Sequence, residues 1–430
     1  MLFPMMLLAS TATLPLLQVE AADKYLKTLE DRIASLEAEV NTTRADSKGK
    51  GSVSSAAIPV YVTPKSKYVQ EIKLRGRLQW QAGYAWGHGY AAGSHTSYAT
   101  QEIRSARIGA EGTLTNDFKF KIDFECVNSV DAKVGLAEGY VEYTGIEFFQ
   151  PKVGKYRPQF GYDEMIPLPK SFTVEKTRLS YGVGTGEITG ASINGQYGVF
   201  NYSLGIFNAV NGTAQAAFDV EPLGNGNQDF LYNASAGVKL KEVVGFPLDF
   251  QVDYMNFTTN PTVCQPNRLN LQQNIDLGMH TAYGPFDLFV EWYNGFNSNA
   301  SAANLNKTGS NSEYAWSLAV CPSVFVIPEK LQAVFRYEMG DAGFTTTGIN
   351  QPFGSRVRYE RYLRSGGATA ESVGALHYYS LYGGLNYYIN GDDLKLMFGY
   401  QFSEQSGSPT GGNANNRSAS TLYGAVRMMF

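Results

Sequence analysis

The feature of this sequence that most restricts its fold is an alternation of apolar and polar residues, which begins at Ile72 and recurs to the end of the chain. It is clearest in residues 72–84, 118–125, 331–338 and 394–402. In 118–125, four apolar residues alternate with two lysines and two acidic residues. Because successive side chains of a β-strand point to opposite faces, each stretch predicts a strand with one apolar face and one charged face.

Two further properties favour a membrane-spanning barrel over a soluble β-sandwich, whose strands also alternate. The apolar positions are rich in aromatic residues, and the alternation lasts for about nine to eleven residues, the length that a tilted strand needs to cross a bilayer. Short connections, such as 116–117 and 283–286, also alternate with long ones, such as 157–190 and 340–373. Seven short and eight long connections predict an all-β, antiparallel transmembrane barrel of 16 strands.

The composition argues against several other classes of protein. Charged residues make up 17% of the chain, whereas soluble domains carry about 25%, and there are 28 Tyr and 25 Phe. The net charge of −4 gives no reason to expect a nucleic-acid partner. The four histidines are scattered, and no metal-ligand spacing, phosphate-binding loop or nucleophile elbow is present. We therefore expect no enzymatic activity, no metal site and no cofactor.

The first 69 residues differ from the rest of the chain. Residues 1–21 are mostly apolar and end in a small-residue pattern, which predicts a secretory signal peptide; a membrane anchor is the alternative. In 22–41, apolar residues recur at spacings of three and four, at Leu26, Leu29, Ile33, Leu36 and Val40. This seam predicts a short oligomerising coiled coil, or else an amphipathic helix docked on the same chain. Residues 42–69 are polar and predict a linker before the barrel, 70–430.

The chain has three cysteines, Cys126, Cys264 and Cys321. An exported protein folds in an oxidising compartment, where one pair can form a disulfide. Cys264 with Cys321 is the favoured pair on this reasoning. Three unpaired thiols are the alternative, and the sequence does not decide between the two.

Several segments of the barrel region carry the motifs of a known family. The most specific is Val153–Gly161, which continues through Val174–Arg178. Further matching segments are 75–80, 103–109, 116–120, 335–338 and 384–391. These motifs resemble the phosphate-selective porin O and P family over most of the chain after the linker. The resemblance implies a trimeric barrel of 16 strands, whose third external loop, about 158–190, folds inward and narrows the pore.

The resemblance matches only part of the constriction found in phosphate-specific members. Arg77 and Arg104 match arginines of the first two strands, but the second arginine of the pair on the second strand is Ser105 here. Ala137 stands where an acidic residue is expected, and the lysine of the third loop is replaced, with Lys170 beside its position. The resemblance therefore implies a porin with a mild preference for anions and no tight phosphate site.

The candidate pore-lining residues are basic residues on the polar side of the alternation, together with basic residues of the third loop. They are Arg75, Arg77, Arg104, Arg107, Lys119, Lys121, Lys170, Lys176, Arg178 and Arg336. Cations in a pore wall lower the barrier for anions. The alternative is that they are ordinary lumen residues paired with Asp123, Glu125 and Glu338. Strict alternation puts Arg104 on the opposite face from Arg107, so a β-bulge, or a position at the external rim, is needed to resolve this conflict.

The function expected from these observations is passive diffusion of small hydrophilic solutes through an outer-membrane porin of a Gram-negative-type bacterium, with mild anion preference. Two alternatives stay open: a porin specific for phosphate or polyphosphate, and a structural or adhesive barrel. The expected partners are outer-membrane lipid, two further copies of the chain in a homotrimer, and the solutes. The coiled coil is expected in the periplasm, because an even number of strands puts both chain ends there.

Overall fold

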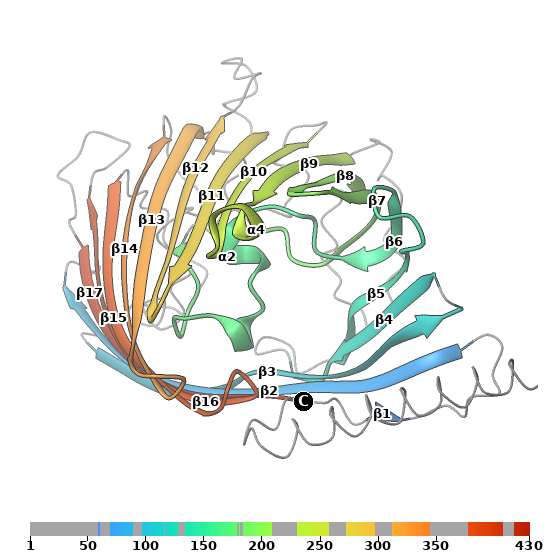
Figure 1. The fold of residues 1–430 in the computed structure, drawn as a ribbon. Coiled ribbons are helices and arrows are strands. Elements are labelled where there is room, and N and C mark those ends of the chain that lie inside the picture. The colour runs from blue at the N-terminus through green and yellow to red at the C-terminus, as the bar shows by residue number, and fades with distance from the viewer. Residues whose placement is uncertain are drawn as a thin grey trace, which may run out of the picture. The chain divides into compact units, whose positions relative to one another are not determined.

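Sixteen antiparallel strands, β2 to β17, form a closed barrel in which the last strand pairs with the first (Figure 1). The structure is a computed structural model, and the residues that it describes are 59–60, 69–88, 97–115, 117–127, 134–178, 180, 184–208, 230–257, 272–296, 312–344, 377–406 and 417–430. A two-residue strand, β1 (Pro59–Val60), pairs with β2. The expected signal peptide 1–21, the coiled coil 22–41 and most of the linker 42–69 lie outside the described residues.

The strands follow one another around the barrel in chain order. They are β2 (Val69–His88), β3 (Ser97–Leu114), β4 (Phe118–Glu125), β5 (Gly135–Tyr143), β6 (Gln150–Tyr156), β7 (Ile188–Tyr197), β8 (Phe200–Asn208), β9 (Phe230–Lys239), β10 (Leu248–Phe257), β11 (Gln273–Tyr283), β12 (Phe286–Phe296), β13 (Ser312–Ile327), β14 (Leu331–Phe344), β15 (His377–Asn390), β16 (Leu394–Ser406) and β17 (Arg417–Met429). The described residues also form three short helices, α2 (Tyr162–Met165), η1 (Leu168–Lys170) and α4 (Lys241–Val244). Within the described residues, no helix is both long and apolar enough to cross a membrane.

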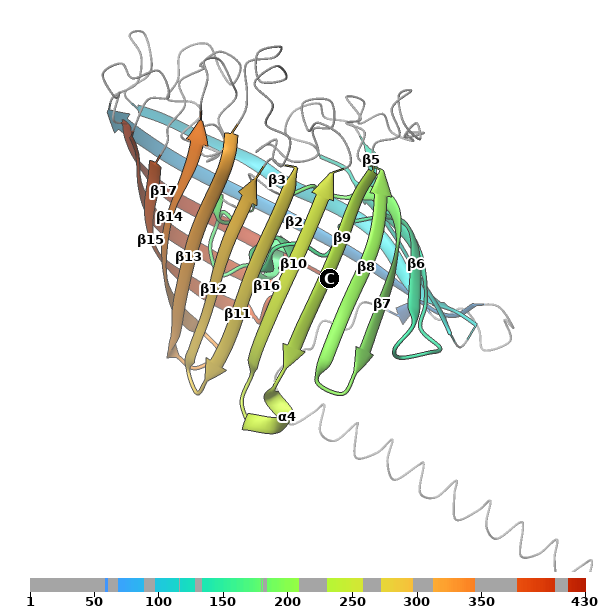
Figure 2. The same ribbon diagram turned by 90° about the horizontal axis from the view of Figure 1, so that it is seen from above.

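The connections alternate in length as the sequence predicted. Short turns join β3 to β4, β5 to β6 and each later odd-numbered strand to its even-numbered successor, up to β15 and β16. Figure 2 shows these turns and α4 at one end of the barrel. The prediction of a 16-stranded antiparallel barrel is therefore confirmed for the part of the chain that the structure describes.

The two faces of each strand are also as predicted, with the apolar face outward. On β16, Phe398 is 62% exposed, whereas Lys395 and Met397 are fully buried inside the barrel. On β2, Leu74 and Leu78 are exposed, and Gln79 is buried. An exposed apolar belt around a polar interior is the arrangement that a bilayer requires of a spanning barrel.

Strands β5 and β6 approach each other closely at Gly154. Its φ of 138° is favourable for glycine only, and a Cβ there would overlap the carbonyl oxygen of Gly139 and the backbone of Tyr140. Gly154 lies in the most specific motif of the sequence and just before the end of β6, from which the chain enters the barrel interior. This glycine therefore fixes the position at which the inner segment begins.

We expect Gly154→Val to destabilise the barrel by about 1–3 kcal/mol, because the new side chain overlaps backbone atoms in an unfavourable φ region. The matched control is Gly383→Val on β15, where a Cβ would meet open space. The temperature at which each refolded variant loses its compact mobility on SDS gels measures the effect. Equal temperatures for the two variants would contradict the close approach at Gly154.

Candidate functional site

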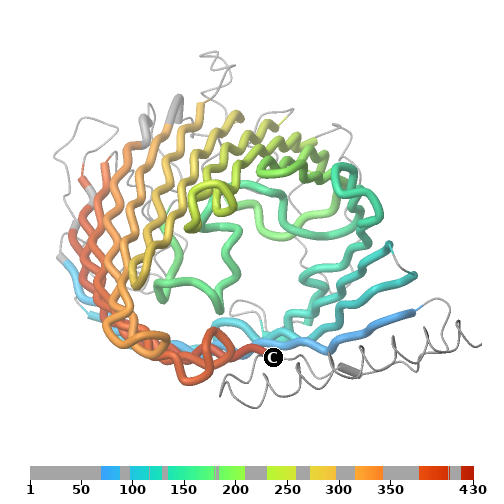
Figure 3. The backbone as a smooth tube through the Cα atoms, viewed as in Figure 1, coloured from blue at the N-terminus to red at the C-terminus, as the bar shows by residue number. Residues whose placement is uncertain are grey.

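The described residues of the connection between β6 and β7, which are 157–178, 180 and 184–187, lie inside the barrel and are called the inner loop below (Figure 1; Figure 3). On one side its helix α2 contacts β11, where Tyr162 stacks on His280 with ring centroids 5.7 Å apart. The backbone N–H of Gly161 donates a hydrogen bond to Asp253 of β10 at 2.9 Å. The inner loop is thus attached first to the wall formed by β10 to β12.

The inner loop is attached a second time to the wall formed by β14 to β17. Buried side chains of all four strands donate hydrogen bonds to its backbone carbonyls. The pairs are Arg336 to Glu175 at 2.7 Å, Asn386 to Phe172 at 2.8 Å, Lys395 to Ser171 at 3.0 Å and Arg427 to Leu168 at 2.7 Å. A hydrogen bond from a charged donor contributes about 1.5–3 kcal/mol, so this set holds the loop firmly to the wall.

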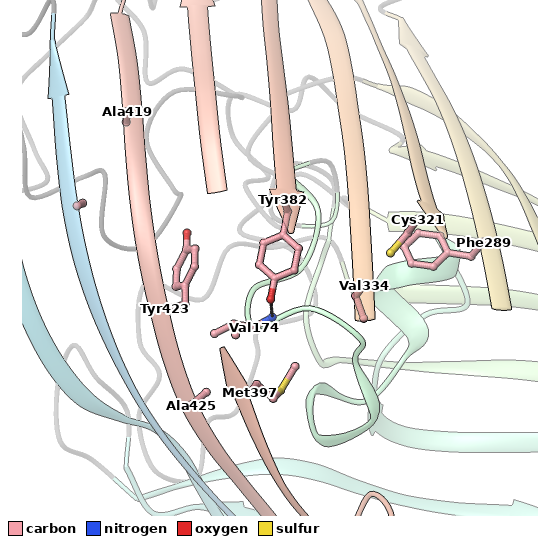
Figure 4. Packing of buried hydrophobic residues seen from close by; sticks show 10 residues of the cluster. Val174, Phe289, Cys321, Val334, Tyr382, Met397, Ala419, Tyr423 and Ala425 are labelled. Carbon is pink, nitrogen blue, oxygen red and sulfur yellow. Dashed lines mark hydrogen bonds between the residues drawn. The ribbon is translucent and has the colours of Figure 1, made fainter. Parts of the chain in front are cut away.

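Val174 is the apolar centre of this second attachment. It is fully buried and belongs to a cluster with Val334, Tyr382 and Met397 of the wall. Figure 4 shows the Tyr382 hydroxyl directed at the backbone nitrogen of Val174, which donates to it at 3.4 Å. The apolar contact and the hydrogen bonds act at the same few residues, so the loop packs against β14 to β17 in one position.

Two basic residues of the inner loop are buried, Lys176 within the loop and Arg178 against the barrel wall. Lys176 is buried and donates to the carbonyl oxygens of Asp163 and Glu164 at 2.8 and 2.6 Å. Burial lowers the pKa of Lys176 below its ordinary value. Arg178 is buried as well, and its backbone N–H donates to Glu338 of β14 while its guanidinium lies over the Tyr378 ring.

Three candidate pore-lining residues therefore lie elsewhere than expected. Lys176, Arg178 and Arg336 are buried: the Lys176 ammonium and the Arg336 guanidinium donate to backbone carbonyls of the inner loop, and the Arg178 guanidinium lies over the Tyr378 ring. Lys170 is exposed at the end of η1. These positions depend on how the loop folds back, which no local pattern in the sequence encodes.

The adjoining wall, β2 to β6, which begins next to β17, carries charged side chains that the inner loop leaves partly accessible. Arg75 and its partner Glu111 have side-chain exposures of 36% and 44%. Each of five lumen cations there is paired with an acid. The pairs are Lys73 with Glu71 at 3.0 Å, Arg75 with Asp123 at 3.4 Å, Arg77 with Glu125 at 3.7 Å, Arg107 with Glu125 at 2.6 Å and Lys121 with Glu138 at 2.5 Å. Lys119 is exposed. The alternative in which the lumen cations are paired with acidic residues thus describes the geometry of this wall.

Of the two expected solutions for Arg104, a β-bulge or a position at the external rim, the structure has the bulge. In the pairing of β2 with β3, Gln79 lies opposite Ser105 and Trp80 lies opposite Ile103, so Arg104 is the extra residue of β3 at this point. The extra residue brings the Arg104 side chain into the barrel, where its Nε lies 3.8 Å from Glu175 of the inner loop. A local break in the alternation therefore resolves the conflict between Arg104 and Arg107.

Three arginines, Arg77, Arg107 and Arg157, gather where the inner loop meets this wall and are called the arginine cluster below. Arg107 and Arg157 both donate to one carboxylate oxygen of Glu187, at 3.1 and 3.2 Å. Burial opposes ionisation of Glu187, but the three arginines outweigh it and hold its pKa well below the ordinary value. Glu187 is therefore a carboxylate anion at neutral pH.

Arg157 and Glu187 were not among the residues singled out from the sequence. Tyr156 of β6 pairs with Ile188 of β7, so Arg157 and Glu187 flank a strand pair and lie at the two ends of the inner loop. The recognisable signal was opposite charges just outside two adjacent strands. Only the observed pairing of β6 with β7 shows that these two charges lie close together.

Neither a metal site nor a disulfide is seen among the described residues. No group of three or more His, Cys, Asp and Glu side chains there is placed to hold a metal ion. Cys126 and Cys321 are free, and Cys321 is buried against Phe289 in the interior of the barrel. For Cys126 and Cys321 the alternative of unpaired thiols therefore holds, and Cys264 lies outside the described residues.

The profile of the family described as phosphate-selective porin O and P matches residues 72–430. The chain belongs to this family. It is an outer-membrane porin, and both family and fold are those of a passive diffusion channel rather than an enzyme. Comparison with curated proteins found no match.

Solved structures share the fold of this porin at low sequence identity. Pseudomonas putida OprB has a TM-score of 0.56 and 11% identity, with 84% of this chain and 94% of OprB covered. An anion-selective porin from Comamonas acidovorans has a TM-score of 0.51 and 12% identity, with 84% of this chain and 99% of that porin covered. Salmonella typhi OmpF, in complex with daunomycin, has a TM-score of 0.51 and 10% identity, with 87% of this chain and 100% of OmpF covered. At these identities the likeness shows the barrel fold.

We expect Arg336→Met to loosen the inner loop of this porin, because it removes two hydrogen bonds to Thr173 and Glu175. Single-channel recordings in planar bilayers should show larger fluctuations of the open-channel current. Arg75→Met is the matched control, since it removes a lumen cation whose described partners are Glu111 and Asp123 on the barrel wall. The same noise in both variants would show that Arg336 does not hold the loop.

Proposed function

We propose that this porin passes small hydrophilic solutes with a mild preference for anions, and that the arginine cluster sets this preference. The observation that carries the proposal is the local balance of charge. The three arginines face Glu125 and Glu187 directly. Glu138 and Glu164 also contact the cluster, but Lys121 and Lys176 pair with them. One positive charge is left in excess at the three arginines themselves. The excess is local, because Lys121 also contacts Asp123 at 3.4 Å, and Arg75 is shared between Asp123 and Glu111 farther along the wall.

One excess positive charge on partly buried side chains of the lumen favours a mild preference for anions rather than strict anion selectivity. Charges in a low-dielectric surrounding act more strongly than in bulk water, so a single cation raises the local concentration of small anions. Salt screens this effect, since the Debye length is about 10 Å at 0.1 M. The cluster already holds carboxylates, and Ser105 and Ala137 replace two residues of phosphate-specific members, so a tight phosphate site is not expected.

We expect Arg77→Gln to remove the excess charge and bring the permeability ratio of chloride to potassium close to about one. The reversal potential under a salt gradient measures this ratio, and the change should be largest at low salt. The control is Lys119→Gln, which removes an exposed cation outside the cluster and should shift the ratio less. Cation selectivity in the unmutated channel would mean that lumen carboxylates dominate, and would overturn the proposal.

The functional assembly in this proposal is a homotrimer held together by residues 22–41 in the periplasm. Residues 1–21 direct export, and residues 42–69 connect the coiled coil to the barrel. The support is the heptad seam of the sequence, together with the trimeric state that the family resemblance implies. A helix this short is marginal alone in water, so it needs partners.

We expect Leu29→Asp with Ile33→Asp to weaken the trimer, because both substitutions place charge in the apolar seam. The amount of trimer that survives heating in detergent, read on gels, measures this. Thr28→Asp with Ser35→Asp adds the same charge outside the seam and serves as the control. Unchanged trimer in the seam variant would favour a helix docked on its own chain.

A further inference from the structure

Glu187 is bound in the way that the arginine cluster would bind an anion from solution. Arg107 comes from β3 and Arg157 from the beginning of the inner loop, so two separate elements present N–H groups to one carboxylate oxygen. Arginine recognises carboxylates and phosphates through the same planar set of donors. The contact between Glu187 and the two arginines therefore has the chemistry of a bound oxyanion.

The Glu187 carboxylate is also placed where a solute can replace it. Its side chain is 16% exposed, so it borders the lumen. The preceding residue, Gly186, has a φ of 70° and open space around its Cα. A side chain tethered next to a glycine can move aside without disturbing strand β7, which begins at Ile188.

We infer that Glu187 is an internal counter-ion that occupies an oxyanion-binding site, and that solutes carrying a carboxylate or a phosphate group exchange with it as they pass. This inference rests on the proposed function, because it names the class of anion that the cluster prefers. The exchange replaces one carboxylate–arginine contact with another of the same kind. Its free-energy change is small, so the solute binds briefly and is released.

The covalent attachment of Glu187 to the chain beside the arginines explains why the oxyanion site binds solutes weakly in the native channel. A group held by a short flexible link competes with an effective concentration in the millimolar range. A solute must overcome this competition, so only high concentrations displace Glu187. Without the carboxylate, the same arginines would retain an oxyanion and slow its passage, so Glu187 keeps the channel permeable.

The test measures how succinate and inorganic phosphate, each added to a chloride solution, reduce the chloride current. We compare Glu187→Gln with Glu111→Gln, which removes one negative charge from the same wall but at Arg75, outside the arginine cluster. Both variants change the lumen charge equally. We expect the half-blocking concentration to fall by about tenfold or more in Glu187→Gln, and clearly less in Glu111→Gln.

Two further variants complete the experiment. Glu187→Asp keeps the charge on a shorter side chain and should give intermediate block, so the inference remains testable if Glu187→Gln folds poorly. Arg157→Gln added to Glu187→Gln should abolish the gained block. Block by succinate alone would assign the site to carboxylates, and block by phosphate alone to phosphate.

The inference is overturned if Glu187→Gln and Glu111→Gln show the same block, because the effect is then general electrostatics. It is also overturned if neither anion blocks Glu187→Gln more strongly than the unmutated channel. Either result is distinct from failure of the proposed function, which appears as cation selectivity in the reversal potential of the unmutated channel.

Discussion

Closure of the sheet, through the pairing of β17 with β2, is the constraint on which the rest of this structure depends. A bilayer offers no hydrogen-bond partners, so an open strand edge within it would cost several kcal/mol for each unsatisfied group. Once the edge is closed, the apolar side of every strand faces lipid and the polar side faces a common interior. That interior supplies the partners which the inner loop needs to fold inside the barrel.

The charged residues of the barrel interior have two different roles. On β14 to β17, Arg336, Lys395 and Arg427 are buried and hold the inner loop by its carbonyl groups. On β2 to β6, the cations keep between 12% and 40% of their side chains exposed and are paired with carboxylates. Only the second group can act on a passing solute. A count of all lumen cations would therefore overstate the preference of this channel for anions.

The barrel could be predicted from the sequence in some detail, while the candidate site could be predicted only in part. Strand number and the alternation of turns and long connections follow from local patterns, and the bulge at Arg104 was one of two alternatives left open by the alternation. The pairing of Arg75 and Arg107 with acids was one of two open alternatives. Lys176 gave no local sign of its burial, because its partners Asp163 and Glu164 lie in a loop without periodicity.

By itself the sequence determined which residues face lipid and which face the lumen wherever the alternation is unbroken, because neighbours along a strand point to opposite faces. At Arg104 the pairing of β2 with β3 decided the direction of the side chain. The tertiary structure alone decided what each lumen charge does. Arg336 reaches Thr173, 163 positions away in the chain, and Arg107 reaches Glu187, 80 positions away. Such contacts depend on the path of the inner loop across the barrel. That path is set by many weak contacts acting together, none of which has a repeating pattern in the chain.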